Sequence, residues 1–232
     1  MEFNIRFEKL VGIALVVLVP CLWVALSIQS YDLSQEGWSS ELTRMGGIGA
    51  GESAGTVILQ FAAGMGLVLA GAALAVTLRT RAPMAGALSG ALIGASGLLV
   101  LAASALYGAT ANLARDYVET GGGPSTLETT RALMLGVGGL TIAAFIAAGI
   151  GVYTMAAVAA QKRLVPRALG WIAAVSAVSV VAAIVTDPFT DSSWLFFILG
   201  AFTMLIWLLL AGGMLVFGKH TLTPGTAVTA PA

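Results

Sequence analysis

One long uncharged stretch in the middle of the chain constrains the fold more than any other feature. The range 84–112 contains no charged residue. Gly86, Gly90 and Gly94 recur within it at every fourth position, so they lie along one side of a helix. An apolar helix of this length can span a bilayer, and a line of glycines lets a second helix approach its backbone closely. The stretch therefore predicts a membrane-spanning helix.

The composition of the whole chain also favours a membrane protein. Of its 232 residues, 58% are hydrophobic and 9% are charged, whereas soluble domains average about 25% charged residues. The formal net charge is zero, which argues against binding to nucleic acid. We therefore expect an all-α, polytopic transmembrane helical bundle that contacts membrane lipids and has no nucleic-acid partner.

Apolar runs separated by short polar, basic or glycine-rich segments predict six spans. We expect a single membrane domain over residues 1–220, followed by a disordered cytoplasmic tail over 221–232. The expected spans lie at about 10–28, 54–78, 84–112, 126–161, 168–186 and 194–217.

The first apolar run has more than one interpretation. Residues 10–28 are long enough to cross the roughly 30 Å hydrocarbon core of a bilayer. The basic residues before them also suit a signal peptide, with a small-residue cleavage site near residues 25–27. Residues 18–21 approach a lipoprotein box, although the proline before Cys21 departs from that pattern. We prefer the retained span, and the sequence leaves open whether residues 1–28 are cleaved.

A second, shorter helix is expected between the first two spans. Leu33, Trp38, Leu42 and Met45 can share one side of a helix that lies on the membrane surface. Glycines at positions 46, 47, 49 and 51 follow it. They end this helix before the span at 54–78 begins.

The long span at 126–161 is expected to begin with a capping box and to carry a second stripe of small residues. Ser125 is the expected N-cap, with Glu128 reaching back to it. The two stripes favour close packing between the spans at 84–112 and 126–161. The chain contains 29 glycines, so chance spacing is the alternative explanation. The second stripe consists of Gly139, Ala143, Ala147 and Gly151.

The distribution of charge predicts the orientation. Basic residues gather in the N-terminal segment, in the turns after the second and fourth spans, and after the last span. The positive-inside rule places these segments in the cytoplasm, with both termini inside a bacterial cytoplasmic membrane. Most acidic residues fall on the opposite side. The basic residues assigned to the cytoplasm are Arg6, Lys9, Arg79, Arg81, Lys162, Arg163, Arg167 and Lys219.

Few side chains within the spans can carry chemistry. Gln60 is the most strongly polar of them and marks a possible polar pocket, whereas the serines and threonines are expected to bond within or between helices. The single cysteine, Cys21, and the single histidine, His220, are expected at different depths. They cannot share a metal centre. We therefore expect no catalytic residue, no cofactor and no metal site, and we expect the acidic residues outside the membrane to be solvated.

The last three spans resemble a family of uncharacterised six-span bacterial integral membrane proteins, a family of unknown function. The resemblance rests on the basic turn Leu164-Val165-Pro166-Arg167 and on Trp171 in the span that follows. It covers about the last seventy residues. The third span departs from the family because it lacks the polar and acidic residues expected there. The resemblance implies a six-span membrane fold and no particular activity.

Two functions are compatible with these features. The first is a non-catalytic component that assembles or regulates a membrane complex, with a homo- or hetero-oligomeric partner. The alternative is a transporter or channel for a neutral or hydrophobic solute that enters near Gln60, although no charge pair or repeated half supports it. We do not expect an enzyme.

Overall fold

The computed structural model describes residues 37–78, 82–161, 167–186 and 193–217, together with Lys9, Gly12, Ile13 and Val16. These residues are helical apart from short connections and include no strand, which confirms the all-α expectation for the described part of the chain. Most of the first expected span, its proposed cleavage sites and the tail at 221–232 lie outside the described residues. The helices are α2 (Trp38–Gly47), α3 (Ala50–Leu78), α4 (Pro83–Thr120), α5 (Pro124–Gln161), α6 (Arg167–Thr186) and α7 (Ser193–Phe217).

Three of these helices are long and apolar enough to cross a membrane. The qualifying segments are Ala50–Val76, Pro83–Thr120 and Pro124–Ala157. Helices α6 and α7 contribute shorter apolar segments, Gly170–Ala182 and Ile198–Leu210. The five ranges expected as spans from residue 54 onward each fall inside one helix. The described chain is thus that of a helical membrane protein.

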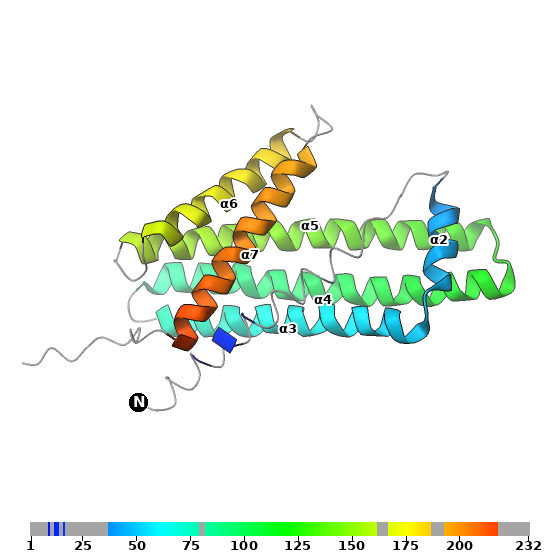
Figure 1. Ribbon diagram of the computed structural model, residues 1–232, viewed down its shortest axis with the longest axis horizontal. Helices are drawn as coiled ribbons and strands as arrows, with labels where there is room; N and C mark the ends of the chain where they lie inside the picture. Colours follow the sequence, from blue (N-terminus) through cyan, green and yellow to red (C-terminus); the bar gives the residue numbers. More distant parts are fainter. Residues whose placement is uncertain are drawn as a thin grey trace, which may run out of the picture.

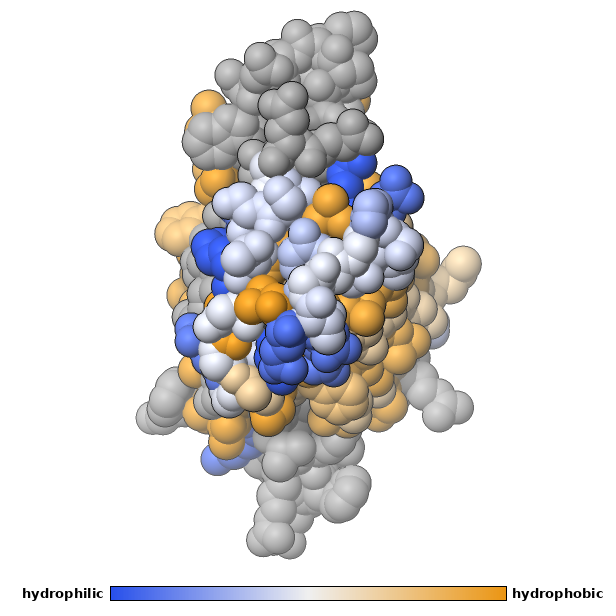
Figure 2. All heavy atoms as spheres, turned by 90° about the vertical axis from the view of Figure 1, so that its right-hand side faces the viewer, coloured by the Kyte–Doolittle hydropathy of each residue, from blue (hydrophilic) through white to orange (hydrophobic). Residues whose placement is uncertain are grey.

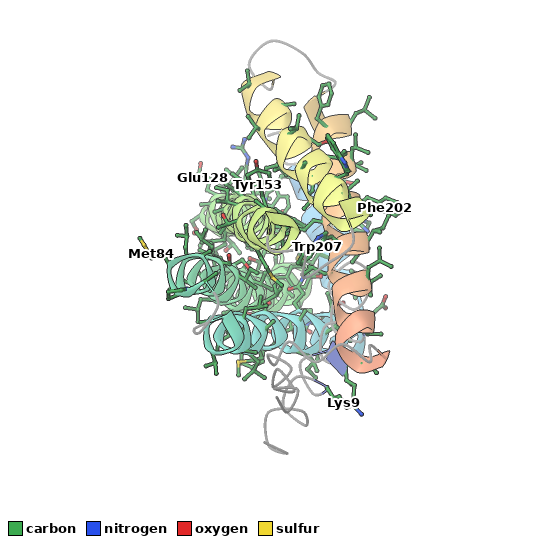
Figure 3. All side chains as sticks on the ribbon, turned by 90° about the vertical axis from the view of Figure 1, so that its left-hand side faces the viewer. Lys9, Met84, Glu128, Tyr153, Phe202 and Trp207 are labelled. Atoms are coloured by element: carbon green, nitrogen blue, oxygen red, sulfur yellow. The ribbon has the colours of Figure 1, made fainter. Side chains whose placement is uncertain are left out.

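Helices α3, α4 and α5 lie side by side, with α4 in the middle (Figure 1). Successive helices run in opposite directions because short connections join them. Helices α6 and α7 pair with each other, and both contact α5 at one side of this layer (Figure 3). Side chains such as Met84, which is 86% exposed, point away from the bundle. Apolar outward faces of this kind suit contact with lipid tails.

Glycines bring α3 and α4 into backbone contact. A Cβ atom added at Gly97 would lie 2.5 Å from the carbonyl oxygen of Gly64 and 2.7 Å from the backbone nitrogen of Val68. One added at Gly90 would lie 2.5 Å from the carbonyl oxygen of Gly71. Only glycine fits at such positions, because any side chain would push the two helices apart.

The turn between α4 and α5 depends on a glycine with a left-handed backbone. Gly121 has a φ of 68°, and the Gly122 N–H donates to the Tyr117 carbonyl oxygen at 3.1 Å. This pattern closes the last turn of α4. Helix α5 then starts at Pro124, where the missing N–H and fixed φ of proline are suited to the first helical position.

The start of α5 corrects the expected capping box. The Leu127 N–H donates to the carbonyl oxygen of Gly123 at 3.4 Å, so the N-cap is Gly123. Ser125 lies inside the first turn and is not the cap. The serine-to-glutamate spacing matches the motif, but α5 already begins at Pro124, the residue before Ser125. The cap therefore lies at Gly123.

Candidate functional site: the α2 end and the bundle interior

One end of the bundle extends beyond the length needed to cross a bilayer. Helices α4 and α5 contain 38 residues each, which corresponds to about 57 Å at 1.5 Å per residue. The hydrocarbon core is only about 30 Å thick. The polar residues of both helices gather at the turn between them, where α2 also lies (Figure 1). We call residues 37–53 and 112–131 the α2 end.

Helix α2 crosses the end of the α4–α5 hairpin and is fixed there by Trp38. The Trp38 side chain is fully buried. Its indole N–H donates to the Leu127 carbonyl oxygen at 3.1 Å and to the Thr130 hydroxyl at 3.2 Å. Both acceptors belong to the first turns of α5. The bonds therefore tie α2 to a helix that lies about 90 residues further along the chain.

The apolar side of α2 packs on α4 as well. Leu42 and Met45 are almost completely buried, in a cluster that includes Tyr107 and Ala114 of α4. Gly46 lies against the Ala114 carbonyl oxygen, and an added Cβ would overlap that atom. The sequence predicted this short helix and its apolar side. In the structure that side meets protein, because α4 and α5 continue far enough to receive it.

Polar side chains are concentrated on the surface of the α2 end. Figure 2 looks onto this end and shows hydrophilic and near-neutral residues over it with a few hydrophobic ones among them, and more hydrophobic surface around them. Arg44 pairs with Glu41 at 2.8 Å. Arg115 donates through Nη2 to the Asn112 amide oxygen at 3.1 Å and to the Ser53 hydroxyl at 3.3 Å, which links α4 to the start of α3. The exposed carboxylates of this end are Glu52, Asp116, Glu119 and Glu128.

Buried hydroxyl groups in the bundle interior are mostly satisfied by their own helices. Ser89 donates to the Ala85 carbonyl oxygen at 2.7 Å, and Ser104 donates to that of Val100 at 2.8 Å. Ser176 is different, since it donates at 2.8 Å to the Gly200 carbonyl oxygen and so joins α6 to α7. These bonds give the hydroxyls a role in helix packing.

Two interior side chains stand apart from this pattern. Gln60 is 4% exposed and shares one face of α3 with the buried Ser53 and Thr56. Trp207 of α7 is 1% exposed and points toward α5 (Figure 3). Its Nε1 is buried and meets no acceptor in the described structure. The sequence pattern singles out Gln60 but not Trp207, because the spacing of residues along the chain does not show whether a buried indole N–H has an acceptor.

The small residues predicted to line helix contacts do not all face the same neighbouring helix. Gly90 touches the backbone of α3, and Gly94 lies there too, since a Cβ added at Gly71 would meet its backbone nitrogen at 2.5 Å. Gly151 faces α4, where an added Cβ would lie 2.9 Å from Ile93. Gly86 is buried.

Three of the predicted positions are not fully buried. A Cβ added at Gly139 meets nothing within 4 Å, and Ala143 and Ala147 are half-buried. The buried small residues of α5 are instead Ala144 and Ala148. These are one position further along the chain, which is about 100° around the helix.

No group of three or more histidine, cysteine or carboxylate side chains that could hold a metal ion lies within the described residues. Comparison of the chain with protein-family models, curated proteins and solved structures finds no match. The functional argument therefore depends on the geometry of the α2 end and of the interior.

Proposed function

We propose that the chain is a non-catalytic, six-span component of a bacterial cytoplasmic membrane that assembles or regulates a membrane complex. Both termini are assigned to the cytoplasm by the positive-inside rule, and the α2 end then lies outside. The partner is a second copy or another membrane protein. The resemblance of the last three spans to six-span bacterial proteins agrees with this assignment.

The observation that carries the proposal is the fixed, projecting α2 end. The first turns of α5, the last turns of α4 and the whole of α2 are held together by the buried Trp38 and by Gly46. A rigid surface loses little conformational entropy when a partner binds. Exposed charges on it supply the orientation that protein interfaces require.

The interior supports a role without chemistry. The serine hydroxyls described above donate to carbonyl oxygens of the bundle itself. Such groups stabilise helix packing and are not positioned as nucleophiles, which need a base within reach. The expected lack of a cofactor and of a catalytic residue is part of this proposal.

The proposal is tested by extracting the protein into lipid nanodiscs directly from its native membrane and measuring the mass of the particle by native mass spectrometry. We expect the wild-type chain in a complex larger than its own 23.5 kDa. The double variant Glu119→Arg, Glu128→Arg reverses two exposed charges of the α2 end. It should release the partner and leave the thermal stability of the chain unchanged.

A matched control changes the same amount of charge elsewhere. Asp187→Arg, Asp191→Arg lies between α6 and α7, on the side of the membrane that the charge distribution also assigns to the outside. This variant should keep the complex. A wild-type chain that is monomeric in nanodiscs, or equal loss of the partner from both variants, would refute the proposal.

A second candidate is a path for a neutral solute near Gln60. The specific observation in its favour is the line of buried polar residues Ser53, Thr56 and Gln60 on α3. Proteoliposomes that contain the chain should then swell faster in glycerol than empty vesicles, and Gln60→Leu should abolish the difference. Equal swelling of both vesicles removes this candidate.

A further inference from the structure

The side of α7 that meets the bundle carries one polar group in apolar surroundings. Met204, Trp207 and Leu208 are three and four residues apart, so they share one side of the helix, and all three are buried. They belong to a buried cluster whose other side chains are apolar. Trp207 points toward α5 (Figure 3), and its indole N–H meets no acceptor in the described structure. This cluster therefore contains a shielded donor that is not satisfied by the protein.

Small residues from three other helices make up much of the same cluster. Trp207 is its largest side chain. Alanine methyl groups extend only a short distance from their helices, so a small outward shift of α7 opens an apolar surface opposite the indole. We call these residues the alanine patch. They are Ala70 and Ala73 of α3, Ala144 and Ala148 of α5, and Ala173 of α6.

Helix α7 is held closely by α6 and less closely by the other helices. Ser176 of α6 donates to the Gly200 carbonyl oxygen at 2.8 Å, and a Cβ added at Gly200 would lie 2.8 Å from the Val180 side chain. Among the described helices, the backbone of α7 does not approach that of α3 or α4. A shift of α7 that opens the alanine patch therefore separates only side chains from α3 and α4.

The depth of Trp207 limits the molecules that can supply an acceptor. Trp207 lies 14 residues after the start of α7 at Ser193 and ten before its end at Phe217, which is about 21 and 15 Å along the helix axis. In the span assignment this is near the middle of the roughly 30 Å hydrocarbon core, whereas phospholipid ester carbonyls lie at its boundary. A buried water needs two to four polar partners, and the side chains of the cluster offer one.

We propose that Trp207 and the alanine patch form a binding site for an apolar, carbonyl-bearing molecule of the quinone class that is dissolved in the membrane interior. The Trp207 N–H donates to one carbonyl oxygen, and the apolar part of the molecule lies against the alanine patch. A buried donor without a partner is unfavourable, and the carbonyl oxygen satisfies it. The molecule is bound as a ligand, without a chemical step. The inference goes beyond the proposed function and uses from it only the assignment of α7 as a span.

Titration of the full chain in detergent with menaquinone-4 tests the site. Native mass spectrometry measures the bound fraction as the mass increment of one quinone. We expect saturable binding to the wild-type chain. Trp207→Phe should weaken the binding by about five- to tenfold, the change in Kd that corresponds to one hydrogen bond. A wild-type chain that binds no menaquinone-4, or a Trp207→Phe chain that binds it as tightly as the wild type, would overturn the proposal.

The matched control variant is Trp171→Phe, which removes a 74% exposed indole from α6. It should bind menaquinone-4 as the wild type does, and a loss as large as that of Trp207→Phe would contradict the site. 

Two further probes need only the wild-type chain and so keep the test decisive if Trp207→Phe does not fold. Squalene, a hydrocarbon without an acceptor, should not bind. Dioleoylglycerol, which has ester carbonyls, should bind more weakly than menaquinone-4. Binding of squalene equal to that of menaquinone-4, or tighter binding of dioleoylglycerol, would overturn the proposal. The nanodisc mass that tests the proposed function does not depend on any of these results.

Discussion

Two of the described tryptophans are almost fully buried and differ in what their indole N–H groups meet. Trp38 donates to two oxygens of α5, whereas the N–H of Trp207 is buried and meets no acceptor in the described part of the chain. A hydrogen bond contributes about 1 kcal/mol to stability, and a buried donor without a partner costs about 1–3 kcal/mol. Removal of the two N–H groups should therefore have different effects.

We predict that Trp38→Phe lowers the free energy of unfolding by about 1 kcal/mol or more beyond the loss caused by Trp207→Phe. Both variants lose the five-membered ring of a buried indole and leave a void, but Trp38→Phe also removes a bonded N–H group, whereas Trp207→Phe removes an unpaired one. The measurement is reversible unfolding in mixed detergent and SDS micelles, followed by circular dichroism. Equal losses of stability in the two variants would contradict the roles assigned to these indoles.

At this scale the sequence predicts which side chains of α2 share a face, but not what that face meets. The spacing of Trp38, Leu42 and Met45 indicates one apolar side, and the structure buries all three. A membrane surface and a neighbouring helix both favour the same pattern. The acceptors on Leu127 and Thr130 lie too far along the chain for local spacing to reveal them.

At the scale of single helices, some glycines are required by a close helix contact and others are not. Gly97 lies against the backbone of α3, while Gly139 of α5 faces open space. A backbone atom cannot move aside as a flexible side chain can. Substitutions at these two glycines should therefore be tolerated very differently.

We predict that Gly97→Leu lowers the free energy of unfolding by about 1–3 kcal/mol or more through overpacking. Gly139→Leu should be neutral or stabilise by up to about 1 kcal/mol, since leucine favours helix over glycine. The midpoint of aggregation on heating in detergent, read by size-exclusion chromatography, compares the two. A loss of stability from Gly139→Leu as large as that from Gly97→Leu would show that the helices pack differently.

The helices themselves were largely predictable, and their mutual contacts were not. Uncharged runs and the stops at Gly121 and Pro124 indicate where helices begin and end. In α5, however, small residues occupy several faces. A four-residue repeat of small residues therefore fits more than one face, and the sequence alone does not show which face is in contact. Ala144 and Ala148 are buried and Ala143 and Ala147 are half-buried, a difference that depends on where the neighbouring helices α4, α6 and α7 lie.

At the scale of the whole molecule, charge asymmetry determines the expected orientation. Basic residues are attracted to the cytoplasmic side during insertion. The turns that contain Arg79 and Arg163 should face the cytoplasm, and the turns at Gly122 and Asp187 should face outside. The orientation would place the polar surface of the α2 end in the extracytoplasmic space.

We predict that alkaline phosphatase fused after Gly122 or Asp187 is active, and that it is inactive after Arg79 or Arg163. Fusions to green fluorescent protein at the same four positions should give the opposite result, because this reporter folds in the cytoplasm. The six-span topology would be excluded if the fusions after Arg163 and Asp187 reported the same side of the membrane in either assay. Such a result would leave the contacts within the bundle unaffected.

The bonds from Trp38 to α5 have a consequence for biosynthesis. The acceptor on Leu127 is 89 residues downstream of the donor, which a ribosome takes roughly 4–18 s to add at about 5–20 residues per second. During that interval the apolar side chains of α2 have been made but their final neighbours have not. The earliest-made part of this end of the protein thus has to wait for the start of α5 before its contacts are complete.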